Sequence, residues 1–192
     1  MALDVYQTLR VQYPRLRLIV VPRHPERFDE VAVILERSGV DWQRRSELSA
    51  EKNPRRGQSP EVLLVDTVGE LGAWWGAAAI ALVGGSFGNR GGQNMLEPAA
   101  YGAAVCFGPN TRNFRDIVAR LLAADAAQVV ASADELKEFV LRALTDPDWA
   151  DRLGRNARDL VIAQQGATAR TVDLLIAELE CETTQPDTSR AA

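Results

Sequence analysis

Residues 61–85, EVLLVDTVGELGAWWGAAAIALVGG, carry the pattern that decides the fold. The stretch opens and closes with runs of Val, Leu, Ile and Ala without polar interruption, and such runs are typical of strands buried on both faces. Between the two runs, the segment TVGELGAWWGA predicts a short helix. A buried strand, a helix and a second buried strand form the repeating unit of a parallel sheet.

The same alternation extends outward from this unit in both directions. Toward the N-terminus it predicts a short helix up to Pro14 and then a strand over residues 15–22 and a helix over residues 25–39. A second strand over residues 41–48 and a polar loop over residues 49–60 follow. Toward the C-terminus it predicts a helix, a strand, a helix and a strand over residues 94–102, 104–108, 113–125 and 127–131. Two helices close the chain over residues 132–144 and 148–179, the second broken at Gly166. The sequence therefore predicts an α/β fold with a doubly wound parallel sheet.

The start of the first closing helix carries a capping box, because Ser132 stands three residues before Glu135. Asp146 before Pro147 is the matching start signal for the second, since aspartate caps a helix and proline suits its first position.

A length of 192 residues suits one domain. We expect residues 1–180 to form a single Rossmann-like domain and residues 181–192 to be a disordered tail, because the tail has no apolar period. Cys106 and Cys181 are the only cysteines, one inside an apolar run and one near the polar C-terminus. A disulfide framework is therefore not expected, a reducing compartment fits, and Cys106 is expected to be buried.

Charge and hydropathy exclude two classes of partner. The chain has 22 basic and 26 acidic residues, a net charge of −4, and no cluster of Lys and Arg long enough to hold a nucleic-acid backbone. The longest apolar stretch, residues 77–83, is far shorter than the ~20 residues that cross a bilayer, and the N-terminus lacks an export-signal pattern. We expect no nucleic-acid partner, no direct insertion into a membrane and a cytoplasmic location.

Four loops follow the predicted strands, and each carries Gly or Pro beside a charged or amide side chain. They are residues 22–26, 66–70, 84–97 and 108–116. In an open α/β sheet, ligands bind at the carboxyl ends of the strands, where such loops meet. The loop 84–97 is rich in glycine and precedes a helix, whose free N–H groups attract anions, so it is predicted to be an anion site.

This loop matches neither of the two common phosphate-binding motifs. The chain has no GxxxxGK[ST] sequence, and Gly84, Gly85 and Gly88 are out of register with GxGxxG. Asn94 followed by Glu97 is also a capping pair, so the spacing alone is equally consistent with two residues that only start the helix. The residues by themselves leave helix capping and ligand binding both open.

Five motifs, taken in order and with their gaps, resemble the C-terminal half of the bacterial Kdo transferases, where Kdo is 3-deoxy-D-manno-octulosonic acid. They are PRHPERF, VDTVGEL, AIALVGGSF followed by RGGQNMLEPAAYG, GPNTRNFRDI and QQGATARTVDLLI, and the resemblance runs from about Arg17 to Leu179. It implies the Rossmann-like C-terminal domain of a two-domain GT-B glycosyltransferase. Such an enzyme moves Kdo from CMP-Kdo to a lipid A precursor in lipopolysaccharide biosynthesis, and this domain holds the nucleotide of the donor.

The resemblance also implies which residues would bind CMP. The expected site comprises Pro22, Arg23, Val68, Gly69, Glu70, Gly85, Ser86, Asn94, Met95, Leu96 and Glu97. Arg23 would contact phosphate or the donor carboxylate, and backbone groups of the turn 68–70 would read the cytosine edge. Free amides at 94–96 would face phosphate, while the Glu97 carboxylate would accept from ribose hydroxyls. Ser86 is placed for a phosphate or for capping a turn.

Gln93 departs from the family pattern, which has a histidine at this position. An amide can donate a hydrogen bond to a phosphate oxygen but cannot take up a proton near neutral pH. The sole histidine, His24, lies in the loop 22–26 and is interpreted as a cap or loop residue. Arg90 and Arg112 are further candidates for phosphate or carboxylate contacts.

The family's N-terminal domain supplies the membrane anchor, the acceptor site and the general base, and these residues include none of them. No catalytic residue is therefore assigned, and we expect the chain alone to bind CMP weakly and to transfer no sugar. No metal or cofactor is expected, because no acidic cluster has metal-ligand spacing. The full-length protein is expected at the cytoplasmic face of the bacterial inner membrane, where the missing domain would meet the lipid A precursor.

Two other functions fit the same pattern. Another GT-B enzyme, such as a UDP-sugar transferase or a UDP-N-acetylglucosamine 2-epimerase, would share the glycine-rich turn and the ribose glutamate. A non-catalytic interaction module would use the adjacent Trp74 and Trp75 as its contact surface. We favour one indole in the core and the other at the interface with the missing domain.

Overall fold

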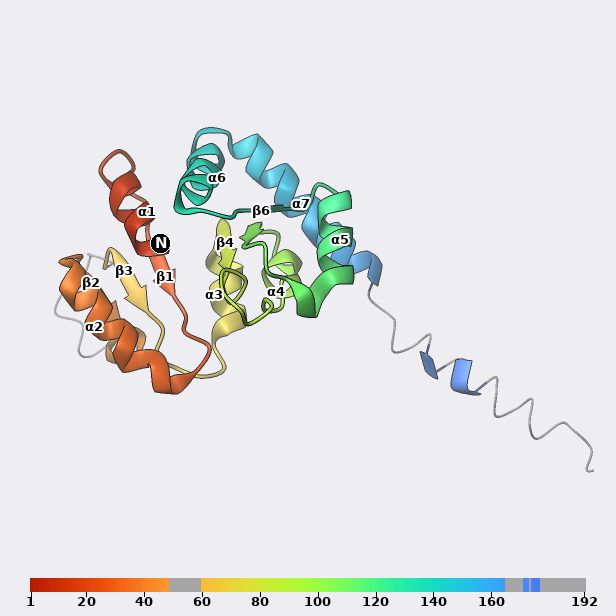
Figure 1. The fold of residues 1–192 in the computed structure, drawn as a ribbon, viewed down its shortest axis with the longest axis horizontal. Coiled ribbons are helices and arrows are strands. Elements are labelled where there is room, and N and C mark those ends of the chain that lie inside the picture. The colour runs from red at the N-terminus through yellow and green to blue at the C-terminus, as the bar shows by residue number, and fades with distance from the viewer. Residues whose placement is uncertain (49–59, 165–170, 173, 177–192) are drawn as a thin grey trace, which may run out of the picture.

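The computed structural model describes residues 1–48, 60–164, 171–172 and 174–176, and helices and strands alternate along it (Figure 1). The helices are α1 (Ala2–Arg10), α2 (Phe28–Ser38), α3 (Leu71–Ala77), α4 (Leu96–Ala100), α5 (Arg115–Ala123), α6 (Ala133–Thr145) and α7 (Pro147–Gln164). The strands are β1 (Leu18–Val20), β2 (Trp42–Arg44), β3 (Val62–Leu64), β4 (Ile80–Val83), β5 (Ala104–Phe107) and β6 (Ala127–Val129). Short 3-10 helices follow three of the strands: η1 (Pro25–Arg27), η2 (Arg45–Glu47) and η3 (Arg112–Phe114). The predicted tail, Cys181, the break at Gly166 and nearly all of the polar loop 49–60 lie outside the described residues.

The strands form two three-stranded sheets, and both are parallel. In the first sheet, β3 lies between β1 and β2, with Leu18 and Trp42 both opposite Val62. In the second, β5 lies between β4 and β6, with Cys106 opposite Leu82. The α/β class and the parallel strands are thus confirmed, but in the described residues no ladder joins the two sheets into one. The alternation of elements identifies the strands, whereas it does not say which strand edges pair.

Helices cover both faces of the second sheet, which is the doubly wound arrangement that the sequence predicts. Val105 and Phe107 of β5 belong to a core cluster with α4, α5 and the middle of α7. Ala104 and Cys106, which point to the other face, belong to a cluster with α1, α6 and the start of α7. Cys106 is buried as expected, and burial raises the pKa of its thiol to about 12.

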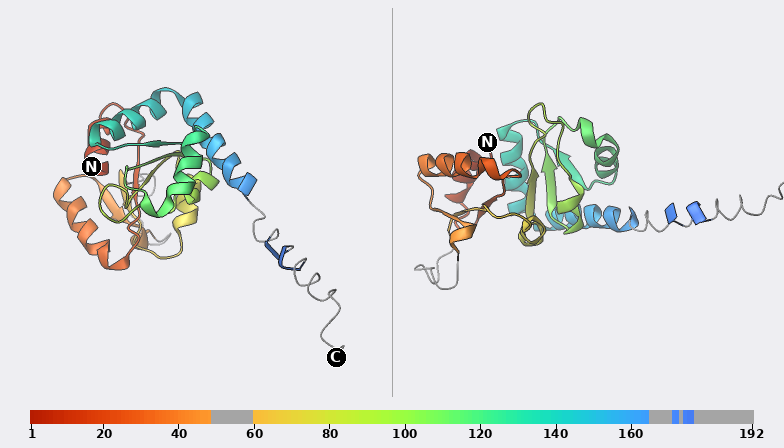
Figure 2. Two further views of the ribbon diagram at one scale, coloured as in Figure 1. Left: turned by 45° about the vertical axis from the view of Figure 1, so that its right-hand side comes forward. Right: turned by 90° about the horizontal axis from the view of Figure 1, so that it is seen from below.

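Helix α1 is shared between the two sheets. In the first sheet, Val62 and Leu64 of β3 pack beneath α2 in a cluster that also contains Tyr6 of α1. Val5 and Leu9, on the same helix, belong instead to the cluster under α6. Figures 1 and 2 show α2 and the first sheet on one side of the molecule and the second sheet with α5, α6 and α7 on the other. A single domain over residues 1–180 stays a prediction, because part of that range lies outside the described residues.

Local signals end and begin several helices as predicted. Gly39 closes α2 in the left-handed conformation, with φ of 69°. At the start of α6, the Ser132 hydroxyl accepts from the Glu135 amide at 3.1 Å, and the Glu135 carboxylate accepts from the Ala131 amide at 2.9 Å. Asp146 likewise caps α7 by accepting from the Trp149 amide at 3.0 Å.

Helix α7 crosses the chain at the end of α4 with no room between the two backbones. A Cβ atom added to Gly154 would lie 2.0 Å from the carbonyl oxygen of Gly102. The glycine at position 154 is therefore required by this crossing, since any side chain would collide with main-chain atoms that cannot rotate away.

Candidate functional site

The glycine-rich loop after β4 lies against the loop after β5, and polar side chains of the second loop hold the main chain of the first. The Asn110 amide donates to the Ser86 carbonyl at 2.9 Å, and the Asn110 side chain donates to the Gly88 carbonyl. Arg112 Nη2 donates to the carbonyl of Asn89 at 2.6 Å. Asn113 donates from its side chain to the Arg90 carbonyl at 3.0 Å and from its amide to the Gly91 carbonyl at 3.1 Å. The carbonyl groups of residues 86 and 88–91 therefore all face the loop 108–114.

Glycine is required where these two loops touch. Gly91 has φ of 82°, and a Cβ atom on it would lie 2.7 Å from both Arg112 Cγ and Asn113 Nδ2. A Cβ atom on Gly108, across the contact, would lie 2.6 Å from the Ser86 carbonyl oxygen. Gly91 therefore leaves room for the side chains of Arg112 and Asn113, and Gly108 allows the two loop backbones to approach closely.

Ser86 is fully buried, and the protein itself uses its hydroxyl. The hydroxyl donates to the Val83 carbonyl at 3.0 Å and accepts from the Gly108 amide at 2.7 Å. Its side chain thus ties the end of β4 to the loop after β5. Neighbouring Gly85 has φ of 77°, and its carbonyl accepts from the Gly92 amide at 3.0 Å.

The expected ribose residue, Glu97, is exposed at the start of α4. Asn94 forms the predicted local pair with it: its Nδ2 donates to Glu97 Oε1 at 3.2 Å, and its Oδ1 accepts from the Leu96 amide at 3.1 Å. Met95 is completely buried in the core, main chain as well as side chain. Helix α4 has five residues and begins at Leu96, so it is shorter at both ends than the helix predicted over 94–102.

Pro22 and Arg23 follow β1 at the carboxyl end of the first sheet. Arg23 is exposed and makes no hydrogen bond or ion pair with the residues that the structure describes. The sole histidine, His24, is also exposed, with Nδ1 3.8 Å from Glu26 Oε1, which is consistent with a loop residue. The hydrogen bond and charge of Arg27, and then the charge of Arg90, lower the pKa of the Glu30 carboxyl.

The turn after β3 exposes Val68 and is held at both ends. Val68 is 80% exposed, and Gly69 has φ of 90°. At one end, Asp66 accepts from the Ser46 amide at 2.9 Å and from its hydroxyl at 2.7 Å. At the other end, Glu70 accepts from Arg45 Nε at 3.0 Å and from Arg45 Nη2 at 3.2 Å.

The pKa of Asp66 reflects this network. Burial alone would raise the pKa of the carboxyl, but the hydrogen bonds from Ser46 and Arg44 outweigh burial and lower it. Sequence reasoning missed Arg44, Arg45 and Ser46, because it extended the second strand through residue 48. The available signal was the pair of arginines followed by a serine, which is unusual within a buried strand.

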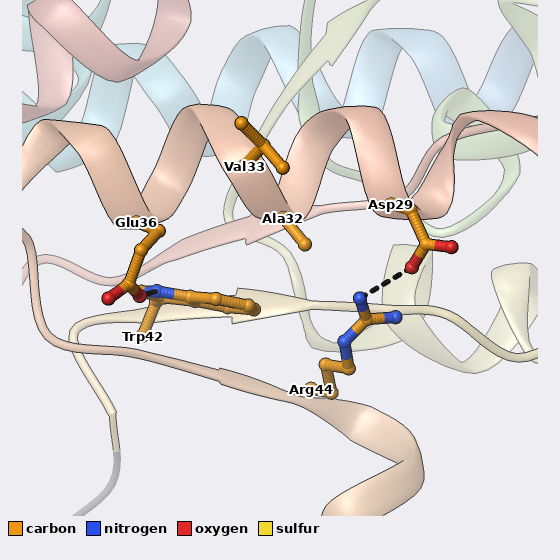
Figure 3. A pocket seen from close by; sticks show the side chains of 6 residues that line it. All are labelled: Asp29, Ala32, Val33, Glu36, Trp42 and Arg44. Carbon is orange, nitrogen blue, oxygen red and sulfur yellow. Dashed lines mark hydrogen bonds and ion pairs between the residues drawn. The ribbon is translucent and has the colours of Figure 1, made fainter.

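A shallow depression lies beside this network, between α2 and the edge strand β2 (Figure 3). Its lining residues are Asp29, Ala32, Val33, Glu36, Trp42 and Arg44. Arg44 Nη2 donates to Asp29 Oδ1 at 2.7 Å, and Trp42 Nε1 donates to Glu36 Oε2 at 3.0 Å. Its polar groups thus pair with one another, and no residue that the resemblance implies for CMP lines it.

Trp74 and Trp75 of α3 are both partly buried. Trp75 packs against the core cluster that contains Val105 and Phe107, as favoured for one of the two indoles. Both indole nitrogens, and the hydroxyl of Thr67, are buried without a hydrogen-bond partner in the described part of the chain.

The described residues hold neither a metal-ligand cluster nor a helix that could span a membrane. Within residues 1–48, 60–164, 171–172 and 174–176, no three His, Cys, Asp or Glu side chains are grouped so that they could hold a metal ion. The same ranges contain no helix with the length and apolar character that crossing a bilayer requires.

The fold is similar to a solved structure described as the C-terminal CMP-Kdo binding domain of WaaA from Acinetobacter baumannii. The similarity has a TM-score of 0.72 and 32% sequence identity, and it covers 83% of this chain and 80% of that domain. The chain belongs to the Kdo transferase family. Within that family it corresponds to the C-terminal domain, as the motifs predicted.

Sequence relatives agree with this membership. A 3-deoxy-D-manno-octulosonic acid transferase from Bordetella pertussis is 40% identical over 174 residues, which are 91% of this chain and 40% of the relative. The Haemophilus influenzae transferase of the same name is 36% identical over 179 residues, which are 93% of this chain and 41% of the relative. The Kdo transferase domain described here thus spans about two fifths of the length of these relatives. No family model matches the sequence.

Proposed function

We propose that this domain binds the nucleotide of CMP-Kdo and forms the donor half of a Kdo transferase. The observation that carries the proposal is the orientation of the glycine-rich loop. In a trans peptide group, the C=O of one residue and the N–H of the next point in opposite directions. Since the carbonyls of the glycine-rich loop point toward the loop 108–114, the N–H groups of the residues that follow them point away from that loop. The N–H groups of Phe87, Asn89, Arg90 and Gly91 therefore form a row of donors, and none has an acceptor among the described residues. Such a row suits the phosphoryl oxygens of a nucleotide.

The remaining roles are those that the resemblance to the Kdo transferases implies. Arg23 is exposed and unpaired in the described part of the chain, so its guanidinium is available for the phosphate or for the carboxylate of Kdo. The Asn94 side chain orients the Glu97 carboxylate, which would accept from the ribose hydroxyls. The exposed turn around Val68 would present backbone groups to cytosine.

In the whole protein, departure of CMP from the sugar leaves an oxocarbenium-like centre and a phosphate that gains negative charge. The N–H row would stabilise that charge without reorganising, because the loop 108–114 already fixes its geometry, and Arg23 would add a positive charge. Gln93, in place of the family's histidine, would donate a hydrogen bond to the phosphate without supplying a proton. We place the general base, the lipid A precursor and the contact with the inner membrane's cytoplasmic face in the N-terminal domain, so this chain alone would transfer no sugar.

Isothermal titration calorimetry with CMP tests the proposal. We expect the parent chain to bind CMP in preference to UMP, and Arg23→Ala or Glu97→Ala to weaken binding by about tenfold or more, the effect of losing one charge-assisted hydrogen bond. Arg155→Ala, on the exposed side of α7, is the matched control and should bind as the parent does. Equal heats for the parent and both site variants would refute the site. Tighter binding of UDP than of CMP would indicate a UDP-sugar enzyme, and no response to any nucleotide would indicate an interaction module.

A further inference from the structure

Two neighbouring residues of η2 hold the two ends of the turn 66–70. Ser46 binds Asp66, the residue at which the turn begins, and Arg45 binds Glu70, the residue at which it ends. Both contacts join segments that are separated by 20 to 25 residues in the sequence. The middle of the turn, residues 67–69, with Val68 and Gly69 exposed, thus lies between two fixed points.

The Arg45–Glu70 contact has the geometry that fixes a carboxylate most strongly. Arg45 donates from Nε and from Nη2 to the two different oxygens of Glu70, at 3.0 and 3.2 Å, so the pair is bidentate. Both side chains are 34% exposed, so water screens the pair only in part. A bidentate pair restricts rotation as well as distance, and it therefore orients the residue that closes the turn.

Arg44 anchors η2 from the other side. Its guanidinium binds Asp29 at the first turn of α2 and lies 3.4 Å from Asp66, as Figure 3 shows for the contact with Asp29. Adjacent residues of one segment therefore reach α2, the start of the turn and its end. The end of β2 and the 3-10 helix η2 thus connect α2 with both ends of the turn.

We propose that Arg45 is a positioning residue: by holding the Glu70 carboxylate, it sets the turn 67–69 in the conformation that recognises the nucleobase. This inference rests on the proposed function, because the turn recognises a base only if the domain binds a nucleotide. Arg45 itself does not touch the ligand. Its effect is therefore specific to the base, whereas phosphate and ribose are held by the second sheet and by Arg23.

Arg45→Met tests the proposal, because it removes the charge and the donors and keeps most of the volume. Arg10→Met is a matched control: Arg10 pairs with Glu61, which lies just before β3, at the opposite end of the same strand. The side chains of Arg10 and Glu61 are 33% and 37% exposed, close to the 34% of Arg45 and Glu70. Each variant therefore loses one Arg–Glu ion pair of similar exposure, and the two pairs lie at opposite ends of β3.

We expect Arg45→Met to weaken CMP binding by about tenfold, since the turn must then be ordered during binding. UMP has the same ribose and phosphate, so its affinity should change by less than about twofold, which is typical of surface substitutions. The preference for CMP over UMP should therefore fall, and it should be unchanged in Arg10→Met. Exchanging the charges, with Arg45→Glu and Glu70→Arg together, should restore part of the preference.

Hydrogen exchange of the amides of residues 67–70 provides a second readout that needs no ligand. We expect faster exchange there in Arg45→Met and no change in Arg10→Met. Equal weakening of CMP and UMP, or an unchanged preference together with unchanged exchange, would overturn the positioning role. Absence of CMP binding in the parent chain would refute the proposed function, and the exchange rates would then still decide whether Arg45 holds the turn.

Discussion

Gly88 and Gly91 lie three residues apart in the glycine-rich loop, and they have different requirements. Gly91 has a positive φ and leaves no space for a side chain, whereas a Cβ atom on Gly88 would meet nothing within 4 Å. Sequence inspection identifies the loop as rich in glycine but cannot separate these two positions, because the difference arises from the loop 108–114. The role of Ser86, for which the sequence left phosphate binding and turn capping open, could not be predicted for the same reason. Its hydroxyl joins two strand ends whose closeness depends on the tertiary fold.

Gly91→Ala should impair both stability and the proposed nucleotide site. The new methyl group meets Arg112 and Asn113, and the left-handed φ adds strain, so we expect the free energy of unfolding to fall by about 1–3 kcal/mol. The displaced loop should also weaken CMP binding. Gly88→Ala serves as the control and should leave both quantities close to those of the parent. Urea denaturation and calorimetry measure the two effects, and similar behaviour of the two variants would show that the loop contact is unimportant.

At the scale of elements, the sequence predicts the order of helices and strands well and their ends less well. The strand predicted over residues 41–48 ends at Arg44, because Arg45–Glu47 turns into a 3-10 helix that pairs with the distant Asp66 and Glu70. Start signals that act within four residues, such as the capping box of α6, are confirmed. Local interactions can be predicted from local sequence, whereas contacts over 20 residues or more require the fold.

The crossing of α7 over the end of α4 gives a prediction at the same scale. In Gly154→Ala the added methyl group would overlap the Gly102 carbonyl, so α7 must shift away from β5. Because the neighbour is backbone, we expect a loss of about 3 kcal/mol in the free energy of unfolding, at the upper end for overpacking. Arg152→Ala, exposed on the same helix, should change it by less than about 0.5 kcal/mol. Urea denaturation of both variants checks this, and equal midpoints would contradict the close crossing.

At the scale of the whole molecule, α1 connects the two sheets that the sequence had predicted as one. Tyr6 packs with the first sheet, and Val5 and Leu9 pack with the second. No sequence signal distinguishes this arrangement, because an amphipathic helix shows which residues are apolar but not which cluster each one joins. Leu9 shares its cluster with Cys106, and this links the packing of α1 to the accessibility of a thiol.

Thiol labelling can therefore report on the opening of the core. Burial raises the pKa of Cys106 to about 12, so in a Cys181→Ser background the native protein should react very slowly with a thiol reagent at pH 8. Leu9→Ala should accelerate labelling, because removing a buried leucine costs about 2–5 kcal/mol and the reagent reaches Cys106 only after opening. Val11→Ala, at an exposed position after the same helix, is the control. Rapid labelling of the parent would contradict the burial of Cys106.

The orientation of the glycine-rich loop has a consequence for how the site can vary. The donors in the row are peptide N–H groups, and every amino acid except proline carries one. Substitutions at Asn89 or Arg90 can thus alter the charge, size or flexibility of the surface without deleting a donor. Related domains could exchange nearly every side chain of this segment and still present the same N–H groups, so long as the loop 108–114 keeps the asparagines and the arginine that hold the carbonyls.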